Sequence, residues 1–248
     1  MNTGKHKLIQ IITILVAVIL LVSGCGTGEE TPTQKASSTD KPDSQQTLVE
    51  EEMTPEDGGT LKASAFPIKQ TDPAKISSDS EVLIANHVYD YLVDVNAENE
   101  IVPRLAQDWS RSEDGLQYTF QLVENATFHD GSEFTAESVV WTYKRLRDTE
   151  GLPTVDLYAN IESIEATSTY EVQFTLQETN PFFLYDLSDN HALMMKAGTE
   201  DPGDFNGTGP FIVEEYRPED RIIMKANPDY FIEDQPKLAG LTIIFFNE

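Results

Sequence analysis

LAQDWSRSEDGLQYTFQLVENATFHDG, residues 105–131, is the stretch that decides the fold. In its middle, hydrophobic residues occupy every second position from Leu116 to Leu122, and polar residues fill the positions between. This period of two predicts a β-strand with one face toward a core and the other toward water. The turn-forming pair Asp114-Gly115 directly before it indicates the second arm of a hairpin. The pattern alone is equally typical of an antiparallel hairpin in any α/β domain.

The residue identities in this stretch are more specific than its periodicity, because they resemble the signature of the family 5 extracellular solute-binding proteins. The motifs that carry the resemblance are Leu105-Ala106, Trp109, Asp114-Gly115, Tyr118-Thr119-Phe120 and Phe128-His129-Asp130-Gly131. Members of this family are peptide-binding receptors of ATP-driven importers, and relatives bind nickel chelates or sugars. In one departure, Val123-Glu124 stands where the family has an Arg after the strand leucine. This departure removes a basic group and leaves the fold assignment intact.

Further motifs extend the resemblance over residues 59–248. They are Val88–Val93, Ile101–Ala106, Glu133–Tyr143, Ile161–Ala166, Val172–Leu176, Asn206–Phe211 and Asn227–Phe231. The resemblance implies a mixed α/β (α+β) fold of the class II periplasmic-binding-protein type. We expect an inserted smaller lobe at residues 88–190 that is complete, and a larger lobe at 59–87 and 191–248 that is incomplete. Because family members are considerably longer, we also expect a fragment that lacks the second ligand-clasping lobe, which carries most charged partners of the ligand termini.

The first 24 residues are typical of a targeting segment. Lys5 and Lys7 precede an apolar run from residue 8 to residue 22, which is short for a permanent membrane span and favours a signal peptide. The run ends in Leu21-Val22-Ser23-Gly24-Cys25, which resembles a lipoprotein processing box and predicts lipidation of Cys25. The alternative is an ordinary secretory signal with a chance cysteine. Since Cys25 is the only cysteine, its lipidation would exclude a disulfide framework and a thiolate metal site.

Residues 25–58 are expected to hold the lipidated cysteine and a disordered, acidic tether. The segment is rich in Ser, Thr, Gln, Pro and acidic residues and has too few apolar residues to offset chain entropy by burial. The net charge of the chain is −26, and removal of the targeting segment would bring it to about −28. Such a charge argues against nucleic-acid binding and against adsorption to anionic lipid. It is compatible either with cationic peptides as cargo or simply with a well-solvated surface.

Hydrophobic periodicity predicts two helices. Ser80 is the expected N-cap of the first, with Ile84, Val88, Tyr91 and Leu92 on its buried stripe. His87 lies close to that stripe and is interpreted as a hydrogen-bonded core residue. Thr135 is the expected cap of the second helix, residues 136–147, and Trp141 is interpreted as core. The buried face of that helix is predicted to consist of Val139, Val140, Tyr143 and Leu146.

The remaining elements are predicted as strands and loops. Besides the central hairpin, the predicted strands are Thr60–Phe66, Ile161–Ala166, Val172–Leu176, Phe211–Tyr216, Arg221–Lys225 and Leu241–Phe246. Phe128 is predicted to be a buried anchor between turns. Gly207 and Gly209 are expected to permit positive φ and a close backbone approach. Since a strand follows them instead of a helix, phosphate binding is disfavoured.

The sequence offers little for catalysis. His129-Asp130 is the one tempting pair, but Asp130-Gly131 is typical of a turn, and neighbouring residues on an extended chain point apart. The four histidines show no zinc-type spacing and no serine-triad signature. We therefore expect no enzyme, no metal site and no cofactor.

The leading hypothesis is a lipid-anchored substrate-binding component of an ABC transporter on the extracytoplasmic face of the cell membrane. Its expected partners are a peptide or similar small solute, the permease subunits, and the membrane through the lipid anchor. The predicted ligand contacts are Ala65, Phe66 and Pro67 after the first strand. Tyr158 is added because, in relatives, the loop corresponding to residues 152–158 reaches the cleft. The alternative is a surface lipoprotein that senses cargo, signals or adheres without transport.

Overall fold

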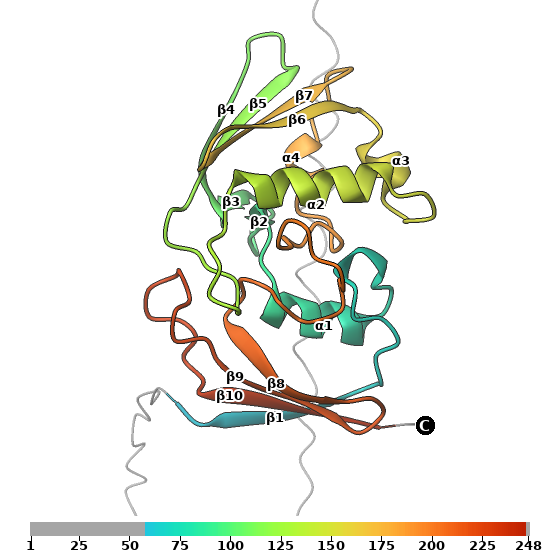
Figure 1. The fold of residues 1–248 in the computed structure, drawn as a ribbon, viewed down its shortest axis with the longest axis vertical. Helices are drawn as coiled ribbons and strands as arrows, with labels where there is room; N and C mark the ends of the chain where they lie inside the picture. The colour runs from blue at the N-terminus through green and yellow to red at the C-terminus, as the bar shows by residue number, and fades with distance from the viewer. Residues whose placement is uncertain (1–57, 247–248) are drawn as a thin grey trace, which may run out of the picture. The chain divides into compact units, whose positions relative to one another are not determined.

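The computed structural model of the protein describes residues 58–246, which contain two four-stranded sheets and a short hairpin (Figure 1). The expected signal peptide, the lipidation site Cys25 and the tether through residue 57 lie outside the described residues. Sheet I has the strand order β1 (Thr60–Ala65), β10 (Gly240–Phe245), β9 (Arg221–Ala226), β8 (Phe211–Arg217). Sheet II has the order β4 (Ala106–Arg111), β5 (Gln117–Leu122), β7 (Glu171–Leu176), β6 (Ile161–Ser168). The hairpin consists of β2 (Val93–Val95) and β3 (Ile101–Pro103).

The helical elements of residues 58–246 are the 3₁₀ turn η1 (Pro73–Lys75), α1 (Asp79–Val88), α2 (Ala136–Asp148), α3 (Val155–Tyr158) and α4 (Phe183–Asp186). Only α1 and α2 are longer than four residues. Helix α1 contacts β8 of sheet I, whereas α2 packs on β6 and β7 of sheet II. Each sheet therefore has a helix of its own to cover hydrophobic side chains.

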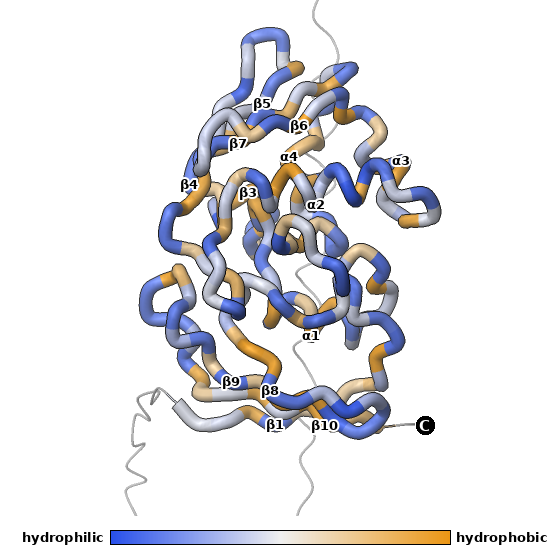
Figure 2. Tube along the Cα trace, in the orientation of Figure 1, coloured by the Kyte–Doolittle hydropathy of each residue, from blue (hydrophilic) through white to orange (hydrophobic). Residues whose placement is uncertain are grey.

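The central hairpin forms as predicted. Strand β5 pairs antiparallel with β4, and its exposed and buried positions alternate, with Tyr118, Phe120 and Leu122 buried. In the turn before it, the Asp114 carboxylate accepts hydrogen bonds from the Leu116 amide at 3.1 Å and from a serine hydroxyl. Gly115 has a φ of 73°, a conformation that favours a residue without a Cβ. The turn is hydrophilic (Figure 2).

Sheet II and α2 enclose an aromatic core. The Phe174 ring lies edge-on to Phe120 at 5.5 Å and to Tyr143 at 5.2 Å between centroids. The expected buried face of α2 is confirmed for Val139, Val140, Tyr143 and Leu146, and Phe128 is buried as predicted. The interpretation of Trp141 as a core residue was wrong, because it is half-buried. The Arg145 guanidinium lies 5.9 Å from its ring centre. Two positions from Val139 correspond to about 200° around a helix, which turns Trp141 away from the buried stripe.

The start of α2 differs from expectation in its cap. Thr135 occupies the N-cap position, but its side chain makes no capping hydrogen bond. The Ala136 amide instead donates to the carbonyl oxygen of Thr169 at 2.9 Å. A tertiary contact thus satisfies an amide that has no partner within the helix.

Sheet I joins distant parts of the sequence. Strand β1 runs parallel to β10, with Thr60 opposite Gly240, and β10, β9 and β8 continue as an antiparallel meander. The strands predicted at these positions are confirmed to within two residues at their ends. Leu241, Ile243 and Phe245 alternate into the core from β10.

The prediction for α1 was wrong at both ends. Its N-cap is Ser78 and not Ser80, because Ser78 and Glu81 form a reciprocal capping box. The helix ends at Val88, because Tyr89 turns to extended backbone with φ −122° and ψ 162°. Tyr91 and Leu92 are therefore buried beyond the helix and not on it.

The first helix leads to the glycine-containing loop of residues 206–210. His87 is hydrogen-bonded as predicted, with its Nδ1 2.7 Å from the Leu83 carbonyl oxygen, but its interpretation as a core residue was wrong, because it is only half-buried. The close approach expected at Gly207 and Gly209 is confirmed: the Gly209 amide donates to the Val88 carbonyl at 2.9 Å. The prediction of a positive φ at these glycines was wrong: neither of them has one. In this region the left-handed conformation falls on Phe205, with φ 60°.

Candidate functional site

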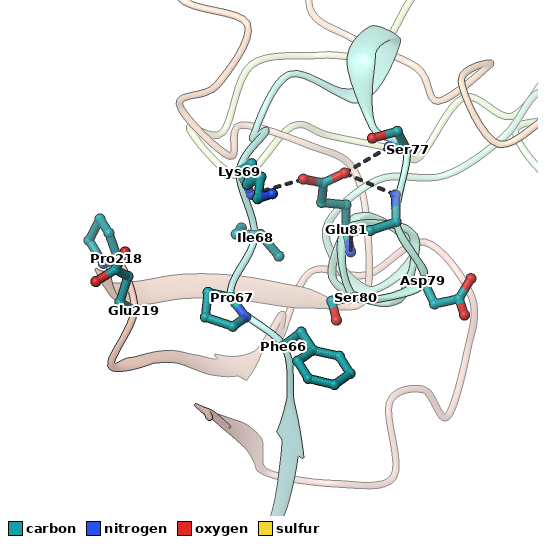
Figure 3. A pocket seen from close by; sticks show the side chains of 11 residues that line it. Phe66, Pro67, Ile68, Lys69, Ser77, Asp79, Ser80, Glu81, Pro218 and Glu219 are labelled. Atoms are coloured by element: carbon teal, nitrogen blue, oxygen red, sulfur yellow. Dashed lines mark hydrogen bonds between the residues drawn. The ribbon is translucent and has the colours of Figure 1, made fainter. Parts of the chain in front are cut away.

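An open hollow of about 870 Å³ lies beside the carboxyl end of β1 (Figure 3). Three segments line it: residues 66–69 after β1, residues 77–81 at the start of α1, and Pro218-Glu219 in the turn between β8 and β9. β1 and β10 are parallel, so the carboxyl ends of both strands meet at this edge of sheet I. In open α/β sheets, ligands bind outside the carboxyl ends of the strands.

Two of the four predicted ligand contacts line this hollow. Phe66 is 49% exposed and Pro67 is half-buried, and both line it directly. Ala65, the last residue of β1, precedes them, and its carbonyl oxygen accepts a hydrogen bond from the Phe246 amide at 3.1 Å. The rings of Phe66 and Phe246 are in contact, with centroids 4.7 Å apart and planes tilted by 37°. The edge thus presents an exposed aromatic pair to solvent.

Glu81 ties two walls of the hollow together. One carboxylate oxygen accepts hydrogen bonds from the amides of Lys69 and Gln70, each at 2.9 Å. The other accepts from the amides of Ser77 at 2.7 Å and Ser78 at 3.1 Å (Figure 3). Burial opposes ionisation here, but these four backbone donors hold the pKa of Glu81 below its usual value. Glu81 is therefore an ionised, 3% exposed clamp between the loop after β1 and the start of α1.

Charged side chains of both signs surround the hollow. Lys69 lies on the loop after β1, Asp79 on the first turn of α1, and Glu219 on the β8–β9 turn, and all three are exposed. Glu219 has a φ of 64°, an uncommon conformation for a residue with a side chain. Sequence reasoning missed these three residues and Glu81. The Ser-x-x-Glu spacing of a capping box at residues 78–81 was the signal that could have found Glu81.

Tyr158, the fourth predicted contact, does not lie at the hollow. It is the last residue of α3, which packs against α2, the helix that covers sheet II. Tyr158 is 1% exposed. Its hydroxyl donates to the Asp186 carbonyl oxygen at 2.7 Å, and its ring lies edge-on to Tyr143. The predicted loop is thus a short helix that directs Tyr158 into the hydrophobic core.

His129 and Asp130 are separately engaged. The Nε2 and Nδ1 atoms of His129 lie 2.9 Å and 3.3 Å from the carbonyl oxygens of Gly209 and Phe205. The Asp130 carboxylate pairs with Lys196 at 2.6 Å and accepts from the Ser132 hydroxyl at 2.5 Å. Each side chain thus fixes a neighbouring loop.

Residues 58–246 contain neither a metal-ligand cluster nor a membrane-spanning helix. In this part of the chain, no three His, Cys, Asp or Glu side chains gather in a group that could hold a metal ion. Within the same residues, none of the helices combines the length and the hydropathy needed to cross a membrane.

Several curated proteins similar to this chain are named as peptide-binding proteins. The chain is 31% identical over 184 residues to the dipeptide-binding protein of Escherichia coli K12, a match that covers 61% of this chain and 33% of the relative. It is 28% identical over 258 residues to the oligopeptide-binding protein AppA of Bacillus subtilis, with coverages of 96% and 44%. The chain thus spans less than half the length of these relatives.

Solved structures agree on the fold. AppA of Bacillus subtilis in complex with a nonapeptide superposes with a TM-score of 0.69 at 27% identity, over 78% of this chain and 41% of that one. The periplasmic binding protein DppA of Helicobacter pylori in complex with the peptide STSA gives 0.67 at 25% identity, over 77% and 43%. The fold is therefore part of the class II periplasmic-binding-protein fold. The family model for bacterial extracellular solute-binding proteins, family 5, matches residues 100–248, more than half of the sequence. The chain belongs to this family.

Proposed function

We propose that this protein captures peptides or similar small solutes outside the cytoplasmic membrane and delivers them to the permease of an ABC importer. The observation that carries the proposal is the hollow at the carboxyl end of β1, lined by Phe66 and Pro67. These residues were expected as ligand contacts from the sequence. Relatives named for dipeptide and oligopeptide binding support peptides as the solute class.

The binding mode follows from the chemistry of the edge. Backbone groups at a sheet edge can pair with the main chain of an extended peptide, which gives affinity with little side-chain selectivity. The exposed Phe66 ring adds an apolar surface, while Lys69 and Glu219 offer one charge of each sign. Peptides of varied sequence are therefore the expected cargo.

The lobes are part of the proposal. Sheet I is built from both ends of the described chain and would form the larger lobe, residues 59–87 and 191–248. Sheet II comes from the middle and would form the smaller lobe, residues 88–190. Closure of lobes over a ligand is a population shift driven by contacts to both sides. The second ligand-clasping lobe is expected to supply the opposite side.

Membrane attachment is proposed from the sequence. Residues 1–24 would direct export, Cys25 would receive the lipid, and the polar segment that follows would serve as a tether. Radiolabelled palmitate should enter the intact protein in cells, and a Cys25→Ser variant should lose the label. Equal labelling of the variant would refute the anchor.

Measurements of peptide binding and peptide uptake test the proposed function. Native mass spectrometry of the intact protein, purified without denaturant, should detect a bound peptide, and calorimetry should measure binding of trialanine. Cells that lack the gene should take up labelled trialanine more slowly than wild type. Binding without any uptake defect would favour the alternative of a cargo-sensing or adhesive lipoprotein, and absence of both would overturn the proposal.

A further inference from the structure

We infer that Glu81 is a positioning residue that sets the ligand-binding conformation of the loop after β1, an inference that rests on the proposed function. Glu81 lies in the wall of the hollow but is only 3% exposed, and four backbone amides occupy its carboxylate. Its effect on a ligand would pass through the backbone that it holds.

The hydrogen bonds of Glu81 restrict both walls at once. The amides of Lys69 and Gln70 belong to the segment that directly follows Phe66 and Pro67. The amides of Ser77 and Ser78 belong to the opposite wall of the hollow. A carboxylate has acceptor capacity on both oxygens, so a single side chain can bind both pairs of amides. Hydrogen bonds to an ionised acceptor are stronger than bonds between neutral groups.

A second contact fixes the same segment from its other side. Asp72, 9% exposed, accepts from the Ala74 amide at 3.1 Å and pairs with the Arg145 guanidinium of α2 at 2.5 Å. Residues 69–78 are therefore held at both ends by Glu81 on α1 and, between those ends, by Arg145 on α2. Between these anchors and the strand β1, the loop that carries Phe66 and Pro67 has little freedom. Ordering a loop before the ligand arrives removes part of the entropy cost of binding.

Glu81→Gln is the decisive variant. Glutamine retains the volume, but its amide nitrogen is a donor and cannot accept from a second pair of backbone amides. One wall is thereby released. We expect the affinity for trialanine, measured by calorimetry on the intact protein, to fall at least tenfold. Glu81→Asp, which keeps the charge but is one methylene shorter, should also weaken binding.

Asp114→Asn is the matched control, because that carboxylate also receives a backbone amide in a tight turn but lies in the β4–β5 hairpin. It should leave the affinity unchanged. All titrations are made at a temperature at which thermal unfolding shows every variant to be folded. Amide hydrogen exchange of Lys69, Gln70, Ser77 and Ser78 is measured without ligand, and Glu81→Gln should accelerate exchange at one pair or both.

The outcomes separate the two proposals. If wild type does not bind trialanine, the peptide-binding function fails, and the positioning role fails with it. If wild type binds but Glu81→Gln lowers only the unfolding temperature, with unchanged affinity, Glu81 is merely structural and the positioning role is refuted. Faster exchange together with a tenfold loss of affinity, in Glu81→Gln but not in Asp114→Asn, supports the inference.

Discussion

Phe66 and Phe246 contact each other through tilted rings, one residue beyond the ends of the parallel strands β1 and β10. Both rings are about half exposed, at 49% and 45%. Two aromatic residues separated so widely in sequence form one surface, because parallel pairing brings the carboxyl ends of the two strands together. This surface borders the hollow on the side of Phe66.

Phe66→Ala should weaken peptide binding more than it weakens the fold. An aromatic contact contributes about 0.5–1.5 kcal/mol beyond burial, which corresponds to roughly a two- to tenfold loss of affinity. Calorimetric titration with trialanine on the intact protein measures the change. Phe182→Ala is the control, because Phe182 is 65% exposed and does not line the hollow. An equal loss in both variants would contradict a specific role for Phe66.

Gly209→Ala should destabilise the fold strongly. A β-carbon added at Gly209 would lie 2.5 Å from the carbonyl carbon of Val88, and backbone at the end of α1 cannot move aside cheaply. We expect the free energy of unfolding to fall by about 3 kcal/mol or more, measured by urea denaturation. At Gly203 the nearest atom would be the Thr71 hydroxyl oxygen at 2.2 Å, which can rotate away. Gly203→Ala should therefore cost about 1 kcal/mol, and equal costs would refute the difference.

Tyr230→Phe should destabilise the fold, because it removes a hydrogen-bond donor from the buried carboxylate of Asp90. Asp90 is 2% exposed and accepts hydrogen bonds from the hydroxyls of Tyr230 at 2.9 Å and Thr208 at 3.1 Å. Burial raises the pKa of Asp90, so the loss of a donor leaves a costly group less satisfied. The free energy of unfolding should fall by about 1–3 kcal/mol in urea titrations. Tyr185→Phe removes the hydroxyl of a 37% exposed residue, and its effect should stay within about 0.5 kcal/mol.

The stability of the protein should decline as the pH rises above about 6.5, through His191. A hydrogen bond from Nδ1 to the Asp189 carboxylate at 2.7 Å raises the pKa of His191, and the Ile76 carbonyl at 3.0 Å from Nε2 adds to this, although burial opposes it. A raised folded-state pKa stabilises the fold fully below the unfolded-state value of about 6.5. That contribution is lost as the pH rises through the folded-state pKa. Urea unfolding of His191→Gln should show a smaller decline over this range than wild type.

His129 provides the opposite case. Burial lowers the pKa of His129, although the carbonyl oxygens of Gly209 and Phe205 and the charge of Asp130 oppose the shift. A lowered folded-state pKa costs stability as the pH falls below about 6.5, since the unfolded chain then binds more protons. His129→Gln should therefore leave the decline above pH 6.5 intact. If His191→Gln behaves in the same way, the assignment to His191 is wrong.

The sequence predicted the strands well because their signals are local. Alternation from Leu116 to Leu122 identified β5, and Asp114-Gly115 located its turn, since both signals depend on neighbouring residues. The start of α1 was misplaced because Ser78 and Ser80 are both possible caps, and only the reciprocal bonds of Glu81 decide between them.

The site was harder to predict than the fold. Phe66 and Pro67 were predicted as ligand contacts and line the hollow, but the position of Phe246 beside Phe66 depends on the long-range pairing of β10 with β1. The partners of Glu81 are backbone amides, which carry no side-chain signal in the sequence. Tyr158 was expected near the cleft, whereas the short helix α3 directs its ring toward Tyr143.

The pairing of β1 with β10 has a consequence for biosynthesis. Thr60 leaves the ribosome long before Gly240, its partner about 180 residues later. At roughly 5–20 residues per second, β1 waits for about 10–40 s before β10 can be made. During that delay the hairpins of sheet II can already form, because their strands are close in sequence. The nascent chain therefore carries its first strand without a partner throughout this delay.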